Sequence, residues 1–392
     1  MLNLKNNEMK LLKTALLGTA FAALTATQSQ AQITIVPEND QFSLKLIGRT
    51  NFDVGTFFDR HEYTVDGNQE RHSLNGVAIN DTRLGVAGKF LEKWDYKIEL
   101  CFAYNDKAKA TAISFRDLFV KYNFNSKHHL QFGNVFMPYG LKPLGLAYKF
   151  IDNSTVDDGI SVARKMGLVY LLTTDHFNFT GGIYSNGNID NGNKQFNQGV
   201  NLAAKAIVRP IINETTILHF GAATIYVDSK NAPSFSGKVP ITFTSDNKTG
   251  LSESWATPHW SRYEAEMIFI HKKFLFETHF EGSSYDRDDD RYHLGGLLAQ
   301  ASYLLIGEQQ NYNKTTGLTA NASPKNLELL ARYDFLDLHE GGHQSDFTIG
   351  LNYFFSKHFN MKLNYGFVKA DKPGVKDSEN YNTIQVRAQF SF

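Results

Sequence analysis

The segment with the most familiar chemical pattern is 339–343, His-Glu-Gly-Gly-His, which matches the H-E-x-x-H signature of zinc peptidases. That signature binds zinc only on a helix, where residues i and i+4 direct two imidazoles toward one ion. Two glycines occupy its centre here, and paired glycines favour turns and disfavour helix interiors. We therefore interpret 339–343 as a loop tip and expect no zinc site in it.

A second candidate is the run from Asp286 to Arg291, whose carboxylates stand at alternate positions as in a calcium-binding loop. The glycine that such a loop requires is replaced by Arg291, and Leu297 stands where the closing glutamate is needed. A solvated acidic loop is the better interpretation. Weak contact with divalent ions or lipopolysaccharide is a minor alternative.

The remaining inventory contains little that could carry a reaction. Cys101 is the only cysteine, which excludes an intrachain disulfide and a thiolate metal site. Neither a Gly-x-Ser-x-Gly nucleophile elbow nor a glycine-rich phosphate loop is present. The sequence therefore predicts no metal site, no cofactor and no enzyme. A formal net charge of zero also gives no electrostatic reason to expect a nucleic-acid partner.

The elements that must position the charged groups alternate between apolar and polar residues. In 42–58, for example, Phe52 and Val54 alternate with Asn51 and Asp53. A period of two indicates a β-strand whose two faces meet different surroundings. The pattern predicts sixteen strands, an even number, at 42–58, 77–90, 94–104, 118–124, 128–136, 166–172, 177–185, 200–209, 217–226, 262–271, 274–284, 294–306, 327–335, 347–355, 359–367 and 384–392.

The connections between these strands alternate in length. Short turns follow most even-numbered strands, with 307–326 as a long exception, and long polar connections follow odd-numbered ones at 59–75, 105–112, 138–164, 186–198 and 227–261. Bacterial membrane barrels have short periplasmic turns and long outer loops. An aromatic content of 13% with a mean hydropathy of -0.34 fits a wall that is apolar outside and wet inside. We therefore predict an all-β fold, a sixteen-stranded antiparallel transmembrane β-barrel formed by 42–392.

The N-terminal residues are typical of a secretory signal peptide. Basic residues extend through Lys13, a largely apolar stretch runs from Ala15 to Leu24, and a small-x-small cleavage pattern ends at Ala31. We expect 1–31 to be removed on export, leaving 32–41 as a short periplasmic segment. Export and amphipathic strands together predict the outer membrane of a Gram-negative bacterium, with lipid and lipopolysaccharide around the barrel.

Five segments share a pattern with one family of membrane proteins, and they are Phe115–Tyr122, Phe132–Leu141, Ala299–Glu308, Leu327–Tyr333 and Gly350–Phe354. Together they extend over nearly the whole mature chain and resemble strands of the phosphate-selective porin O/P family. The resemblance implies a homotrimer of sixteen-stranded barrels, in which inward-folded loops narrow the lumen and arginines and lysines guide small anions. A dense arginine ladder is not evident in this sequence, which leaves open whether the selectivity is strict.

The chain ends in Phe392 after a run of alternating apolar residues. This ending resembles the C-terminal signature of outer-membrane barrels, which the barrel-assembly machinery reads. We therefore expect Phe392 to be recognised by that machinery.

Taken literally, the alternation assigns charged side chains to the lumen face. The expected path for anions comprises Lys45, Arg49, Arg83, Lys89, Lys205, Arg332 and Arg387. Candidates on a constricting loop are Lys142 and Lys149, and the opposing acidic wall comprises Glu264, Glu266, Glu277 and Glu281. Arg49, Arg83 and Arg387 fall near the middle of neighbouring strands, so we expect them at a similar depth. Opposed walls of charge would create a transverse field, whereas the alternative is a random scatter of charges over a polar face.

Three functions stay open from the sequence. The first is a passive porin that prefers anions such as phosphate, and the second is a general diffusion porin with weak charge preference. The third is an outer-membrane hydrolase, for which scattered histidines and aspartates supply no assembled set of residues. The first two differ in ion selectivity, and the third predicts turnover of a substrate.

Overall fold

The computed structural model describes residues 33–38, 41–63, 69–105, 110–141, 149–160, 162, 164–185, 199–228, 234–238, 248–255, 257, 259–287, 290–371 and 379–392. The predicted signal peptide at 1–31 and the predicted constriction residue Lys142 lie outside these ranges.

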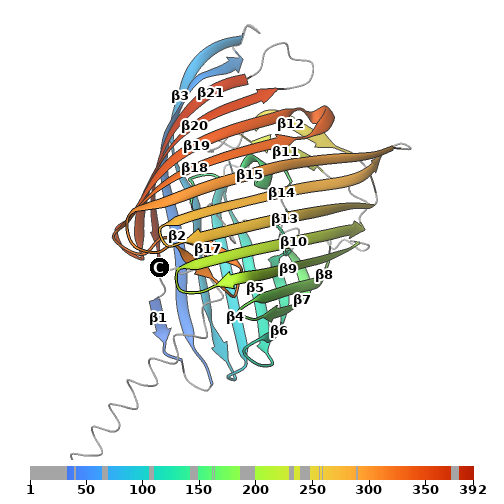
Figure 1. The fold of residues 1–392 in the computed structure, drawn as a ribbon, viewed down its shortest axis with the longest axis vertical. Helices are drawn as coiled ribbons and strands as arrows, with labels where there is room; N and C mark the ends of the chain where they lie inside the picture. Colours follow the sequence, from blue (N-terminus) through green and yellow to red (C-terminus); the bar gives the residue numbers. More distant parts are fainter. Residues whose placement is uncertain are drawn as a thin grey trace, which may run out of the picture.

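Within the described ranges, sixteen strands form one closed antiparallel barrel, which confirms the predicted fold class (Figure 1). The strands are β2 (Leu44–Tyr63), β3 (Gln69–Phe90), β4 (Trp94–Asn105), β5 (Ala110–Asn123), β6 (His128–Phe136), β7 (Arg164–Thr173), β8 (Phe177–Ser185), β9 (Val200–Ile212), β10 (Thr216–Asp228), β13 (His259–His271), β14 (Phe274–Arg287), β15 (Asp290–Ile306), β18 (Asn326–Asp337), β19 (His343–Phe354), β20 (Phe359–Asp371) and β21 (Glu379–Ser391). Each pairs with its neighbours in sequence order, and β21 pairs with β2 to close the ring. A short strand, β1 (Ile33–Val36), also pairs with β2.

Several predicted connections contain more strand than the sequence indicated, as three of them show. Most of 59–75 belongs to β2 and β3, which extend beyond the predicted strands. The connection 227–261 contains β11 (Ser234–Lys238) and β12 (Lys248–Ser254), which pair with each other. The segment 307–326 contains a hairpin of β16 (Asn311–Asn313) and β17 (Leu318–Ala320).

The two faces of the wall have opposite character. On β3, Val77 is 75% exposed and Ile79 is 70% exposed, and on β8 Ile183 is 58% exposed. Side chains on the opposite face of the wall are covered, as Gln385 and Arg387 of β21 show. A soluble protein does not leave a continuous apolar belt in water. The exposed apolar side chains therefore face lipid, and the covered polar side chains face the barrel interior.

Aromatic side chains gather where the short turns leave the wall. Phe90 stacks on Trp94 with ring centroids 5.7 Å apart, and Trp94 contacts Tyr122 at 4.9 Å. Further round the barrel, Phe359 stacks on Phe390 at 4.6 Å. Rings at this level form the aromatic girdle that membrane barrels place at the boundary between hydrocarbon and water.

The C-terminus completes the seam of the barrel. The backbone N–H of Gly48 donates to the Phe392 carbonyl at 2.7 Å, and the Phe392 N–H donates to the Gly48 carbonyl at 2.9 Å. A Cβ atom on Gly48 would lie 2.5 Å from Cζ of the Phe392 ring, so a side chain there would displace the ring. Glycine therefore lets the terminal ring lie flat against β2.

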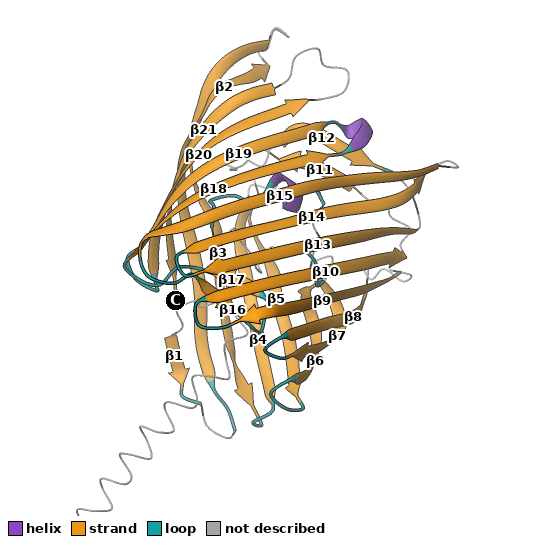
Figure 2. Cartoon of the chain, in the orientation of Figure 1, coloured by secondary structure: helices purple, strands orange, loops and turns teal. Residues whose placement is uncertain are grey.

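Within the described ranges, at least two connections turn toward the barrel interior. The first contains α2 (Thr155–Gly159), whose N-cap Ser154 accepts a hydrogen bond from the Asp157 N–H. The second is the β16–β17 hairpin, in which Tyr312 contacts His219 of β10. Figure 2 shows α2 within the outline of the barrel near β15, which it contacts. Among the described residues, no helix is long or apolar enough to cross a membrane.

Candidate functional site

Cationic and acidic side chains alternate along the inner face from β2 to β7. The basic ladder, as we call this set, has four cations and three carboxylates, and its members are Arg49, Asp81, Arg83, Glu99, Lys97, Asp117 and Arg164. The successive contacts are Arg49–Asp81 at 2.7 Å, Arg83–Asp81 at 2.6 Å, Arg83–Glu99 at 3.3 Å, Lys97–Glu99 at 3.6 Å, Lys97–Asp117 at 2.7 Å and Arg164–Asp117 at 2.6 Å. These side chains are 4% to 9% exposed, so each is closely packed against its neighbours.

A bulge places one carboxylate between two arginines of the ladder. Arg49 on β2 and Arg83 on β3 are register partners, so their like charges face each other on adjacent strands. The register shifts immediately beyond them, between Arg49 and Asn51, and Asp81 has a φ of 53°. Bulges redirect side chains, and here the Asp81 carboxylate contacts both guanidinium groups. The bulge therefore relieves the repulsion that regular alternation would leave.

Arg387 on β21 forms a separate buried pair with Asp53 on β2. The guanidinium donates from Nε to Asp53 Oδ1 at 2.6 Å and from Nη2 to Oδ2 at 2.7 Å, and Nη1 donates to the Ile151 carbonyl at 2.5 Å. Asp53 is the register partner of Arg387, whereas Arg49 is opposite Ser391. Arg387 thus lies four residues along the strand from Arg49, which is about 13 Å. The expectation that the three arginines lie at a similar depth is wrong.

The acidic wall on β13 and β14 holds part of the first inward connection. Glu264 accepts a hydrogen bond from the Gly140 N–H at 2.7 Å and faces its register partner Glu281. Lys205 of β9 pairs with Glu266 at 2.6 Å and with Glu264 at 3.4 Å. The structure thus places Lys205 with the acidic residues and not with the arginines. The wall carries less net negative charge than its glutamates alone suggest.

Both inward connections are fastened to the wall and to each other. Lys149 forms an ion pair with Glu328 of β18 and donates to Gln310 Oε1 at 3.2 Å. Thr319 of the β16–β17 hairpin donates to Glu277 Oε1 at 2.6 Å. The predicted constriction residue Lys149 therefore lies against the wall, in a buried pair.

The other predicted lining residues are spread around the ring. Lys45 on β2 is half-buried, and Lys89 on β3 pairs with Glu38 at 2.7 Å. Arg332 on β18 pairs with Asp334 at 2.9 Å, on the side of the barrel that the inward segment covers. These three cations are not part of the basic ladder.

The H-E-x-x-H segment does not form a helix that could direct both imidazoles at one ion. A 3-10 turn, η2 (His339–Gly341), ends before His343, which begins β19. The His343 imidazole lies 2.9 Å from Asp371, and the His339 ring packs against Tyr292. The two histidines therefore have separate partners.

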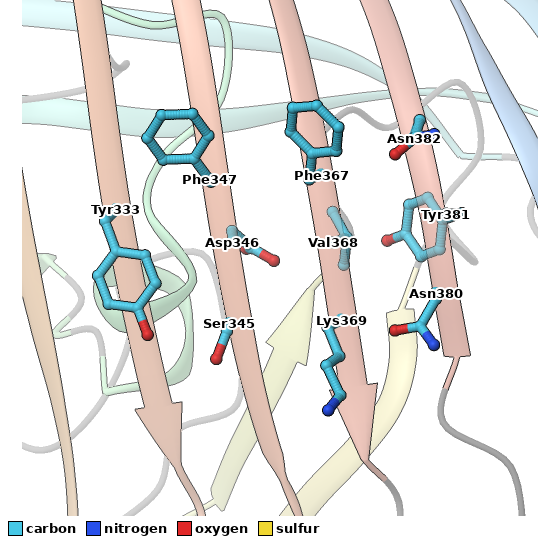
Figure 3. Close-up of a pocket in the computed structure, with 10 residues that line it drawn as sticks. All are labelled: Tyr333, Ser345, Asp346, Phe347, Phe367, Val368, Lys369, Asn380, Tyr381 and Asn382. Carbon is cyan, nitrogen blue, oxygen red and sulfur yellow. The ribbon is translucent and has the colours of Figure 1, made fainter.

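A hollow of about 360 Å³ lies at the outer ends of β18 to β21 (Figure 3). Its lining combines the outward-facing rings of Tyr333, Phe347 and Phe367 with the inward-facing side chains of Asp346 and Tyr381. Because both faces of the sheet contribute, the hollow belongs to the wall, and we assign no solute to it.

The sequence analysis assigned Arg49 and Arg83 to the lumen but did not assign their ladder neighbours Lys97, Glu99, Asp117 and Arg164. Lys97 and Glu99 have the polar parity of a predicted strand, so strict use of the alternation would have found them. Asp117 and Arg164 lie just outside the predicted strand boundaries. The alternation alone therefore could not assign them.

A family model described as phosphate-selective porin O and P matches residues 48–392. No curated protein matches the chain. Several solved structures are similar in fold. The outer membrane channel DcaP of Acinetobacter baumannii has a TM-score of 0.58 at 12% identity, covering 91% of this chain and 99% of that one.

Two further structures are of comparable similarity. An anion-selective porin from Comamonas acidovorans has a TM-score of 0.56 at 12% identity, over 90% of this chain and 100% of that one. A trimer form of OmpT, an outer membrane protein of Vibrio cholerae, has a TM-score of 0.54 at 13% identity, over 90% and 100%. At these identities the likeness concerns the fold alone.

Proposed function

The chain belongs to the family of phosphate-selective porins O and P, and from that premise we propose that its pore passes small hydrophilic anions such as phosphate. It is an outer-membrane β-barrel porin. In the proposed function, solutes cross by diffusion along the basic ladder and are not chemically converted.

The observation that carries the proposal is the position of the ladder relative to the inward segment. The segment 149–160 is held by three strands. Arg262 of β13 donates a hydrogen bond to the Ile160 carbonyl, and Lys149 forms an ion pair with Glu328 of β18. Arg387 of β21 donates to the Ile151 carbonyl. The ladder lies on β2 to β7, across the ring from β13 and β14. We propose that solutes pass beside the segment along this wall, which has more cations than carboxylates.

Arginine suits such a passage because its charge is permanent and its planar fork pairs with two oxygens of a phosphate. A conducting site must also release its ion. The carboxylates of Asp81 and Glu99 compete with a passing anion for Arg83, and this competition keeps each binding step shallow.

General diffusion with weak charge preference is the second candidate, and one observation favours it. Every arginine of the ladder is paired with a carboxylate, and Arg387 is fully neutralised by Asp53. If the paired charges cancel at the distance of a passing ion, only size would limit the solute.

The oligomeric state and the assembly of the barrel are also matters of proposal. We propose a homotrimer, which is supported by the trimer form of a structurally similar protein. We also propose that Phe392 is the residue that the barrel-assembly machinery recognises, since it forms the last bonds of the closing seam. Lipopolysaccharide and lipid would surround the exposed apolar face.

The decisive experiment is the reversal potential in a potassium chloride gradient across a planar bilayer, with inorganic phosphate as a blocker. The test variant combines Arg49→Gln, Arg83→Gln and Asp81→Asn, which removes one net positive charge and leaves Glu99 paired with Lys97. The control is Arg387→Gln with Asp53→Asn, which removes an arginine without changing the net charge.

We expect the parent to prefer anions and to be blocked by phosphate. The test variant should lose part of that preference, most clearly at low ionic strength, where screening is least. The control should retain it. Equal reversal potentials in the parent and the test variant would favour general diffusion.

A further inference from the structure

Three potential metal ligands meet where α2 reaches the inner face of β14. One ligand atom from each of Asp157, His279 and Glu281 lies within 4.8 Å of the other two. Asp157 belongs to α2, and His279 and Glu281 share one face of β14. All three side chains are covered. The cluster thus joins the inward segment to the barrel wall, and neither sequence motif considered above includes it.

The histidine of the cluster is buried without a hydrogen-bond partner. His279 is 2% exposed, and among the described residues neither Nδ1 nor Nε2 has a hydrogen-bond partner. Its Nε2 faces Asp157 Oδ1 at 3.8 Å and Glu281 Oε1 at 3.7 Å, which is too long for hydrogen bonds. A buried polar group left unpaired is costly, so this arrangement requires an explanation.

A second buried histidine on the inner face has the hydrogen bonds that His279 lacks. His219 of β10 has the Tyr312 hydroxyl 2.9 Å from Nδ1 and the Glu266 carboxylate 3.0 Å from Nε2. Both ring nitrogens are therefore satisfied by direct contact. At His279 the nearest carboxylate oxygens lie 3.7 and 3.8 Å from Nε2, compared with 3.0 Å at His219.

The Asp157 carboxylate is held in the orientation that a ligand needs. Ser154 Oγ donates to Asp157 Oδ2 at 2.8 Å and accepts from the Asp157 N–H at 2.9 Å. The other oxygen, Oδ1, has no hydrogen-bond partner in the part of the chain that the structure describes, and it is the atom that faces His279. The helix cap thus fixes one oxygen and directs the second toward the imidazole.

The distances suit a small cation. Zinc binds imidazole nitrogen and carboxylate oxygen at about 2.0–2.2 Å, so ligand atoms on one tetrahedral ion lie roughly 3.3–3.6 Å apart. The separations of 3.7 and 3.8 Å from His279 Nε2 require only a slight contraction, and the two carboxylate oxygens, which lie within 4.8 Å of each other, would also have to approach. Two carboxylates with a neutral imidazole balance a charge of two. A nitrogen ligand favours zinc and its transition-metal neighbours over calcium and magnesium, which prefer oxygen.

One neighbouring charge works against the cation. The guanidinium of Arg262 interacts electrostatically with the Glu281 carboxylate. It also donates to the Ile160 carbonyl at 2.8 Å, at the end of α2. Because part of the negative charge is offset, we expect weaker binding than at a site without a nearby arginine.

From these contacts we propose that Asp157, His279 and Glu281 bind a divalent transition metal ion of the zinc class, with water completing its coordination. The ion links α2 to β14 and fixes the inward segment against the wall. The site is a property of the folded barrel and does not depend on which solute the pore passes.

The test is zinc binding to the folded full-length protein in detergent. Titration calorimetry with zinc chloride, and metal analysis after gel filtration, should give one buried zinc per chain. His279→Gln and Asp157→Asn should each weaken this binding at least tenfold. The matched control is His343→Gln, which removes an exposed histidine–carboxylate pair with a 2.9 Å contact and should leave the buried site unchanged.

Folding of each variant is checked by circular dichroism and by heat-modifiable migration. If His279→Gln fails to fold, Asp157→Asn decides, because asparagine keeps the size of the helix residue. Zinc should also raise the unfolding temperature of the parent but not of Asp157→Asn. The proposal is overturned if the parent binds no zinc, if both buried-site variants bind it as the parent does, or if His343→Gln alone abolishes binding.

Discussion

The buried pair between Arg387 and Asp53 gives the sharpest prediction of stability. Arg387 is 0% exposed and Asp53 is 1% exposed, and two hydrogen bonds of 2.6 and 2.7 Å join them. Removing one partner of a buried ion pair costs about 3–5 kcal/mol, because the other charge stays buried alone. We therefore expect Arg387→Gln to lower the free energy of unfolding by about that amount.

The double variant separates the charge effect from the loss of a contact. With Asp53→Asn added, no charge is left uncompensated, and most of the loss should be recovered. The hydrogen bond from Arg387 to the Ile151 carbonyl is still absent, so a deficit of about 1 kcal/mol should remain. Urea unfolding of the barrel in lipid vesicles, followed by tryptophan fluorescence, measures all three proteins.

An exposed pair serves as the control for this experiment. Arg291 contacts Asp286 at 3.2 Å, and both side chains are 65% exposed. Arg291→Gln should change the free energy of unfolding by about 0–1 kcal/mol, as exposed pairs do. The reasoning fails if Arg387→Gln is as stable as the parent, or if the double variant is no more stable than Arg387→Gln.

Three other predictions concern the inward segment, the lipid face and the seam. Burial, partly offset by Arg387, raises the pKa of Asp152 to about 7. The free energy of unfolding of the parent should therefore fall relative to that of Asp152→Asn as the pH rises from about 4 to 7. Urea unfolding at a series of pH values measures this difference, which should stay constant above about pH 7. Ile349→Lys on the lipid face of β19 should cost about 2–4 kcal/mol of folding free energy in vesicles, whereas Phe355→Lys near the turn should cost about 0–1, and equal costs would contradict the assigned lipid level. Deleting Phe392 removes two backbone hydrogen bonds to Gly48 and should lower the amount of barrel in outer-membrane fractions, and normal amounts would argue against its proposed recognition.

The sequence was sufficient to predict the barrel because alternation is a local property. Each strand has its apolar and polar faces within a few consecutive residues, as Phe52, Asp53 and Val54 illustrate. Lipid outside and water inside impose that period on every strand, whatever its neighbours. The first two strands extend beyond their predicted ends at 58 and 77, since β2 continues to Tyr63 and β3 begins at Gln69.

What the charged side chains touch was decided by the tertiary structure. The sequence placed Arg49 and Arg387 on the same face, but the strand register sets them four residues apart and gives each its own carboxylate. The bulge at Asp81 and the buried helix cap that brings Asp157 to His279 have no local signal. The alternation along a strand states which side of the wall a residue faces. A contact between residues of distant strands depends also on register, on bulges and on the path of the inward segments. These are fixed only when the barrel closes.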